Sequence, residues 1–173
     1  MDDPEASPFQ HCFAAMFETH FARLYRYLDR LSGEPELASD IAQEAFVRLF
    51  RRGSMPDTPE AWLISVALNL FRNAKSSRSR RSRLLTATRS EGVLADPPLA
   101  PDQAAMVEDS RGRVRTALDR LSQRDRGLLL LRAEGYSYRD IAVALELNEA
   151  SVGTLLARAR RAFRDCYEDP DAP

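Results

Sequence analysis

The segment GYSYRDIAVALELNEASVGTLLARARRAF, Gly135 to Phe163, decides the fold, because it reads as two short helices separated by a tight break. The first predicted helix covers Tyr136–Leu145 and the second covers Glu149–Phe163, with Asn148 suited to cap the second. Four apolar side chains of the second helix share the side that we expect to pack on the first: Val152, Leu156, Ala159 and Phe163. A three-residue break between two capped helices predicts a helix-turn-helix.

The opposite side of the second helix carries small residues first and arginines behind them. This order suits a helix whose first turn approaches base edges in a DNA groove while its later arginines meet phosphates. The alternative is an amphipathic helix whose charged face is only solvated. The predicted DNA contacts of this helix pair are Ser137, Arg139, Glu149, Ala150, Ser151, Thr154, Arg158 and Arg161.

Charge is distributed unevenly along the 173 residues, although the 25 basic and 26 acidic side chains nearly cancel. The stretch from Arg72 to Arg89 has seven basic residues and no acid, whereas Asp29 to Glu44 has five acids and one arginine. An acidic segment together with two basic segments suits a protein with two kinds of partner.

Three further helices are predicted upstream, over about residues 13–31, 35–51 and 59–75, and no segment alternates like a strand. The second of them carries two apolar rows that we expect to be buried: Leu37, Ile41, Ala45 and Leu49, and Ala38, Ala42, Phe46 and Phe50. The buried stripe predicted for the third is Leu63, Val66, Ala67, Leu70 and Ala74. The fold class is therefore all-α.

The sequence EGVLADPPLAPD, residues 91–102, contains three prolines, a glycine and no sustained period, which indicates a linker. We therefore predict two small helical domains, 10–85 and 105–168, joined by a flexible linker over 86–104. The C-terminal domain is the one with the helix-turn-helix.

Polar side chains gather on the faces of the second and third helices that point away from the predicted core. The second helix presents Asp40, Gln43, Glu44 and Val47. The third presents Ser65, Asn69 and Arg72, with Trp62 and Asn73 at the margins. Tryptophan, asparagine and arginine on one face offer stacking, base-edge hydrogen bonds and a phosphate contact, which together suit single-stranded DNA. Two alternatives stay open: a merely solvated acidic face, and a Trp62 packed against the first helix.

Together these segments resemble the extracytoplasmic-function (ECF) group of bacterial RNA polymerase sigma factors. DIAQEAF, residues 40–46, resembles the family's helix that docks on the polymerase clamp. PEAWLISVALNLFRN, residues 59–73, is similar to the helix that opens and binds the minus-ten element. Residues 121–160 resemble the domain that reads the minus-thirty-five element. The three motifs occur in the family's order and cover nearly the whole chain.

The resemblance implies a transcription initiation factor that binds core RNA polymerase, directs it to promoter DNA and is silenced by an anti-sigma factor, often membrane-bound. It assigns polymerase binding to Asp40, Gln43, Glu44 and Arg48. It assigns minus-ten binding to Trp62, Ser65, Asn69, Arg72, Asn73, Arg80 and Arg81. The helix-turn-helix residues named above would bind the minus-thirty-five element.

The second helix of the pair departs from the family at Gly153, Thr154 and Leu155, where many relatives have Lys, Ser and Arg. A glycine inside a helix costs about 1 kcal/mol relative to alanine, so we expect Gly153 to permit a close approach of the backbone to DNA. We expect Leu155 to pack rather than to contact DNA.

Other classes of protein fit the sequence less well. No phosphate-binding glycine loop and no nucleophile with a nearby histidine is present, so we expect neither an enzyme nor a cofactor. A zinc site built from His11, Cys12, His20 and Cys166 is disfavoured by its spacing. No apolar run is long enough to span a bilayer, so we expect a cytoplasmic protein, associated with the nucleoid when active or held near the membrane by an anti-sigma factor. The rivals are a conventional helix-turn-helix regulator and an adaptor that only titrates an anti-sigma protein.

Overall fold

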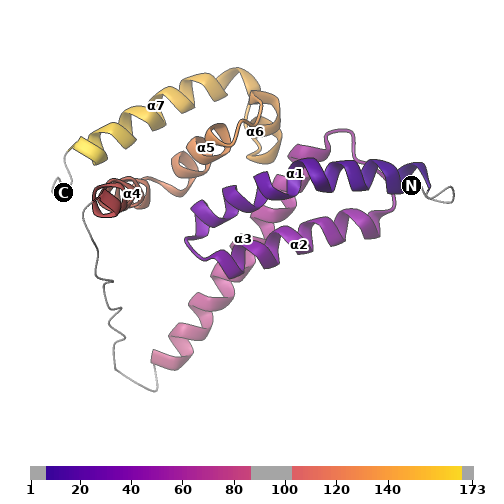
Figure 1. The fold of residues 1–173 in the computed structure, drawn as a ribbon, viewed down its shortest axis with the longest axis horizontal. Helices are drawn as coiled ribbons and strands as arrows, with labels where there is room; N and C mark the ends of the chain where they lie inside the picture. The colour runs from indigo at the N-terminus through magenta and orange to yellow at the C-terminus, as the bar shows by residue number, and fades with distance from the viewer. Residues whose placement is uncertain (1–6, 87–102, 169–173) are drawn as a thin grey trace.

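The structure is a computed structural model that describes the backbone of residues 7–86 and 103–168, and the side chains of 7–78 and 110–168. All regular structure in these ranges is α-helical, which confirms the all-α prediction. The helices are α1 (Pro8–Ser32), α2 (Pro35–Arg52), α3 (Pro59–Thr86), α4 (Gln103–Asp119), α5 (Gln123–Ala133), α6 (Tyr138–Ala144) and α7 (Glu149–Glu168) (Figure 1).

Local sequence signals determine where most of these helices begin and end. Ser7 and Gln10 form a reciprocal capping box that starts α1 five residues before its predicted start, and Gly33 closes the helix in the left-handed region with φ 71°. Ser137 and Asp140 form a reciprocal capping box that starts α6. The Asn148 side chain accepts a hydrogen bond from the Ala150 backbone N–H at 3.0 Å, as expected of the cap of α7.

The third helix is longer than predicted, because α3 continues to Thr86 rather than ending near residue 75. Residues 76–86, which lie beyond the predicted end of this helix, contain neither proline nor glycine, and their arginines and leucines are good helix formers. Arg80 and Arg81 therefore lie on this helix, but their side chains fall outside the described set.

Helices α1, α2 and α3 pack together, and α2 contributes most of the two apolar rows that were predicted to be buried. Ala38, Ile41, Ala42, Ala45, Phe46 and Leu49 are buried as expected. Phe50 is a correction, since its side chain is 51% exposed rather than buried. It lies in the last turn of α2, where its ring packs on Phe13 and Phe9 of α1, with centroids 5.2 and 6.2 Å away, and the rest of the ring is exposed.

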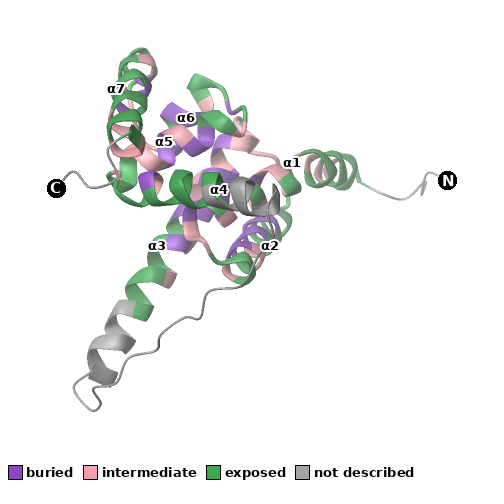
Figure 2. Ribbon diagram, turned by 60° about the vertical axis from the view of Figure 1, so that its left-hand side comes forward, coloured by how far each residue is buried: buried purple, intermediate pink, exposed green. Residues whose placement is uncertain are grey.

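Helix α3 is buried on two sides, which the sequence pattern did not predict. Ile64, Leu68 and Phe71 are buried, whereas the predicted core residues Val66, Leu70 and Ala74 are only half-buried. The reason is that α6 packs on α3 and α5 packs on α1, so the C-terminal helices cover a second stripe of α3 (Figures 1 and 2).

The buried side chains form one continuous cluster that runs from Leu24 and Ile64 in the N-terminal helices to Leu128 and Val152 in the C-terminal ones. Neither group of helices has to build a complete core alone. The predicted linker, 86–104, lies outside the described residues except at its ends, which belong to α3 and α4. The predicted domain boundaries therefore stay predictions.

Candidate protein and nucleic-acid interfaces

The predicted polymerase-binding residues lie together on the outer face of α2. Asp40, Gln43 and Arg48 are exposed and Glu44 is half-buried. The Arg48 guanidinium donates to the Glu44 carboxylate at 2.9 Å across one helical turn, and the Gln43 amide donates to the Ser39 hydroxyl at 3.1 Å. Asp40 makes no hydrogen bond or ion pair with another described side chain, so its carboxylate is available to a partner.

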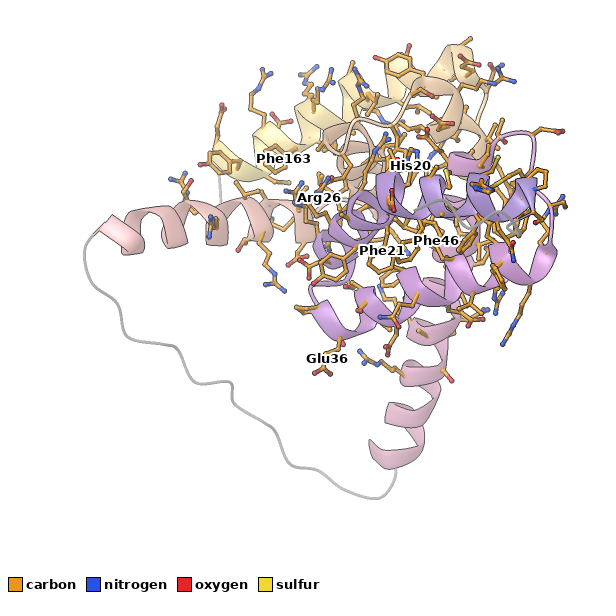
Figure 3. All side chains as sticks on the ribbon, turned by 45° about the vertical axis from the view of Figure 1, so that its right-hand side comes forward. His20, Phe21, Arg26, Glu36, Phe46 and Phe163 are labelled. Carbon is orange, nitrogen blue, oxygen red and sulfur yellow. The ribbon has the colours of Figure 1, made fainter. Side chains whose placement is uncertain are left out.

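An exposed apolar patch adjoins this face; Val47 was predicted to point outward, but the exposed phenylalanines of the patch were not predicted. Phe17 and Val47 are 40% and 39% exposed, beside Phe50. The Phe17 ring packs edge-on against the Phe46 ring with centroids 5.1 Å apart, and Figure 3 shows Phe46 between α1 and α2. The signal that could have revealed the patch is the spacing of Phe9, Phe13, Phe17 and Phe21, which places four rings on one face of α1.

The residues of α3 predicted to bind the minus-ten element differ in exposure: some side chains are open to solvent, whereas others are half-buried against the fold. Asn69, Arg72 and Asn73 are exposed, and the Arg72 guanidinium donates to the Asn69 side-chain oxygen at 3.2 Å. Ser65 is half-buried, and its hydroxyl donates to the carbonyl of Ala61 at 2.9 Å. The polar edge that a nucleic acid can reach is therefore centred on Asn69 and Arg72.

Trp62 is half-buried and packs against the edge of the apolar core. The guanidinium carbon of Arg52 lies 5.9 Å from the centre of its ring, a cation–π distance. The indole therefore packs on the core with one part and keeps another part exposed, and its role in DNA binding stays a prediction.

The helix-turn-helix is formed by α6 and α7, and the turn between them is closed by Glu146 with φ 54°. On α7, Val152, Leu156 and Ala159 are buried as predicted, while Phe163 is half-buried. The predicted DNA contacts are all exposed: Ser137, Arg139, Glu149, Ala150, Ser151, Thr154, Arg158 and Arg161. Ser137 and Arg139 lie at the start of α6, and the other six lie on α7.

Among the described residues, Arg158 is the one of these predicted contacts that forms an ion pair inside the protein. Its guanidinium lies 3.4 Å from the Asp125 carboxylate on α5. Leu155 is half-buried against the core, as predicted. An alanine methyl at Gly153 would meet the Tyr138 ring at 3.6 Å, an ordinary contact, so the fold itself does not require glycine there.

Tyr27 carries a buried hydroxyl with no hydrogen-bond partner among the described residues. Burial of the ring raises the pKa of Tyr27 far above its ordinary value, and the neighbouring Tyr136 ring adds to this effect. Because the folded state holds the phenol proton more tightly than the unfolded chain does, ionisation of Tyr27 costs no stability below pH 10, and the free energy of unfolding falls as the pH rises above 10.

Cys12 is exposed on α1 and Cys166 is half-buried on α7, so the two thiols lie in different parts of the fold. Among residues 7–86 and 103–168, no three His, Cys, Asp or Glu side chains are grouped so that they could hold a metal ion. Within the same part of the chain, none of the helices combines the length and the apolar character needed to cross a bilayer.

Comparison with known sequences matches both parts of the chain to family models. Residues 16–81 match sigma-70 region 2, and residues 111–163 match sigma-70 region 4. The chain is similar to the ECF RNA polymerase sigma factor SigL of Mycobacterium tuberculosis, with 32% identity over 165 residues that cover 87% of this chain and 85% of the relative. It is 33% identical to SigE of Mycolicibacterium smegmatis over 84% of this chain, which spans 58% of that relative.

Two solved structures share the fold. The sigma factor RpoE from Bartonella quintana, in complex with the anti-sigma factor NepR, superposes with a TM-score of 0.66 at 21% identity, covering 93% of this chain and 99% of that one. CnrH, in complex with the cytosolic domain of CnrY, superposes with a TM-score of 0.63 at 24% identity, covering 94% and 91%.

Proposed function

The chain belongs to the ECF RNA polymerase sigma factors, and we propose from this premise which of its surfaces perform the steps of initiation. The outer face of α2, formed by Asp40, Gln43, Glu44 and Arg48, binds core polymerase. The exposed edge of α3 binds the minus-ten strand, and the outward surface of α7 binds the minus-thirty-five duplex. The protein performs no chemistry itself, and it requires no cofactor.

The observation that carries this proposal is the exposed carboxylate of Asp40, which pairs with no other described side chain, next to the Glu44–Arg48 pair. A solvated acid is common on helices, but here it adjoins the exposed apolar side chains Val47 and Phe50. Interfaces combine an apolar centre with a polar rim that sets orientation, and this part of α2 has both.

Minus-ten binding draws support from the arrangement of Asn69 and Arg72. The Asn69 amide is exposed for hydrogen bonding to a base edge, and the guanidinium one turn away supplies a phosphate contact. Trp62 lies seven residues before Asn69, about 10 Å along the helix axis. That spacing suits a few nucleotides of an extended strand.

Run-off transcription with core polymerase on a genomic promoter library tests the function. Wild-type protein should produce discrete transcripts, and the variant Asp40→Arg/Glu44→Arg should lose both polymerase co-purification and transcripts while keeping its helicity. Glu18→Arg/Asp57→Arg is the matched control, since it makes the same charge change at two exposed positions outside α2.

Unchanged co-purification of the Asp40→Arg/Glu44→Arg variant would show that this face is only solvated. DNA binding without any stimulation of polymerase would favour a conventional helix-turn-helix regulator. Capture of an anti-sigma protein without transcripts would favour an adaptor.

Control by an anti-sigma factor is part of the proposal, and it is supported by the two structural neighbours, both of which were solved as complexes with a partner protein. We place the protein in the cytoplasm, on the nucleoid when active and near the membrane when a membrane-bound anti-sigma factor holds it. Fractionation of cells with and without the anti-sigma factor tests this localisation.

A further inference from the structure

A cleft of about 750 Å³ lies between the end of α1 and the helices α4 and α5. Four arginines line it, and they come from all three helices: Arg30 on α1, Arg111 and Arg115 on α4, and Arg126 on α5. Among the described residues that line the cleft, Asp29 is the one carboxylate. Sites for small molecules in proteins have volumes of about 300–1,000 Å³, so the cleft is large enough for such a ligand.

The arginines of the cleft keep hydrogen-bond donors that the protein does not fill. Arg111 forms no hydrogen bond or ion pair with another described residue. Arg115 donates through Nη2 to the carbonyl of Gly33 at 3.2 Å. Both terminal nitrogens of Arg126 donate within the protein, but its Nε is buried without a partner among the described residues. Because a guanidinium has five N–H donors, several donors around the cleft have no protein partner.

The side of α4 that lines the cleft has the spacing of a core stripe but not its composition. Its residues recur at intervals of three, one and three, which places them on one face of the helix: Arg111, Val114, Arg115 and Leu118. Val114 is 37% exposed and Leu118 is half-buried. Two arginines four residues apart repel each other, so α4 would be more stable with an anion bound beside them.

The lining combines three kinds of chemistry. Arginine binds phosphate through planar, often paired hydrogen bonds. Val114 and Leu118 add an apolar wall, which suits a flat ring. Asp29 is half-buried, and its carboxylate makes no hydrogen bond or ion pair with another described residue, so it can accept hydrogen bonds from hydroxyl groups. Phosphates, hydroxyl groups and a flat ring occur together in nucleotides.

We propose that this cleft is a nucleotide-binding site, with Arg111 and Arg115 on the phosphates and Asp29 on the ribose hydroxyls. The site adds a small-molecule ligand to the polymerase and DNA contacts proposed above and does not depend on them. None of the residues that line it belongs to the predicted polymerase-binding or DNA-binding sets. A bound nucleotide stabilises the folded protein, and this effect rises with the nucleotide concentration.

Isothermal titration calorimetry of the 173-residue chain with ATP, inorganic pyrophosphate and adenosine tests the site, in magnesium-free buffer so that the phosphates keep their charge. ATP should bind about tenfold more tightly than pyrophosphate, because its ribose and ring add contacts, and adenosine should bind far more weakly than ATP. Arg111→Glu should weaken ATP binding by about tenfold or more, because it replaces attraction with repulsion. Arg160→Glu is the matched control, since Arg160 is exposed on α7 and lies outside the cleft, and it should leave the ATP affinity unchanged.

Asp29→Ala separates ribose recognition from general charge attraction. Without this carboxylate the cleft is more positive, so pyrophosphate should bind the variant more tightly by about twofold or more. ATP should bind the same variant more weakly, because an acceptor for its hydroxyl groups is lost. The variant should fold normally, since an acid near the C-terminal end of α1 is unfavourable to the helix dipole. Tighter binding of both ligands would overturn the nucleotide assignment.

Three further results would overturn the site: no ATP binding by the wild-type protein at millimolar concentration, equal affinities for ATP and pyrophosphate, or equal weakening by Arg111→Glu and Arg160→Glu. Displacement of ATP by a short duplex without promoter sequence, through binding that also weakens in Arg111→Glu, would assign the arginines to DNA phosphates instead. Thermal unfolding without ligand checks the fold of each variant. Arg111→Gln repeats the test with a smaller change and should weaken ATP binding less than Arg111→Glu does.

Discussion

Gly153→Ala separates a stability role from a DNA-binding role at one position of α7. Gly153 lies inside the helix and its backbone is not in the left-handed region, so alanine can adopt the same conformation. The added methyl would lie 3.6 Å from the Tyr138 ring, a distance that requires no movement. Helix propensity alone should then raise the free energy of unfolding by about 1 kcal/mol.

For a chain of this size, a change of about 1 kcal/mol corresponds to an increase of about 2–4 °C in Tm. Urea unfolding followed by circular dichroism measures the stability change. Gly112→Ala is the matched control, because Gly112 lies inside α4 and its added methyl would meet nothing within 4 Å. Both variants should gain similar stability.

The two variants should differ in binding to a minus-thirty-five duplex. If Gly153 permits close approach of the helix backbone to DNA, Gly153→Ala should bind more weakly while Gly112→Ala binds like wild type. A loss of stability in Gly153→Ala would refute the packing argument. Unchanged DNA affinity would refute the close-approach hypothesis and leave the glycine without a role in binding.

Three other variants test separate parts of the structure. Arg72→Ala should weaken binding to all promoters and lower the salt slope by about one, whereas Asn69→Ala should mainly alter base preference in the minus-ten element; identical effects of the two would contradict separate phosphate and base contacts. Tyr27→Phe should keep or raise stability at pH 7 by up to about 1 kcal/mol, because it removes a buried hydroxyl without a partner, and should reduce the loss of stability above pH 10 in urea titrations. Ser122→Ala should cost about 1 kcal/mol in the same assay, because its hydroxyl caps α5 by accepting from the Asp125 N–H at 3.1 Å; an unchanged midpoint would mean that water replaces the cap.

Local sequence signals were sufficient for several helix caps, although they missed the start of α1 and the end of α3. Ser137 with Asp140, Asn148 and Gly33 act within a few residues of their own position, so their chemistry is readable without the fold. The helix-turn-helix follows from the same local information together with the apolar spacing of α7. The outward face of α2 was predictable because the opposite side of that helix is so uniformly apolar.

Residues that are buried by distant segments could not be assigned from the sequence. Ile64 and Leu68 are covered by helices that follow more than 50 residues later, so the period of α3 alone could not distinguish them from exposed apolar residues. Phe50 was placed in the core by its row, but it lies in the last turn of α2, where Phe9 and Phe13 of α1 cover only part of its ring.

The sequence by itself determined the all-α class, the helix-turn-helix pair and the family, since each depends on short-range spacing that can be recognised without knowledge of packing. Only the tertiary structure decided that the two groups of helices share one core and that Glu134 is covered by Arg26 and Arg30. The physical reason is that an ion pair between side chains more than a hundred residues apart leaves no periodic pattern in the sequence. It exists only because packing of α5 on α1 brings a carboxylate into reach of an arginine face.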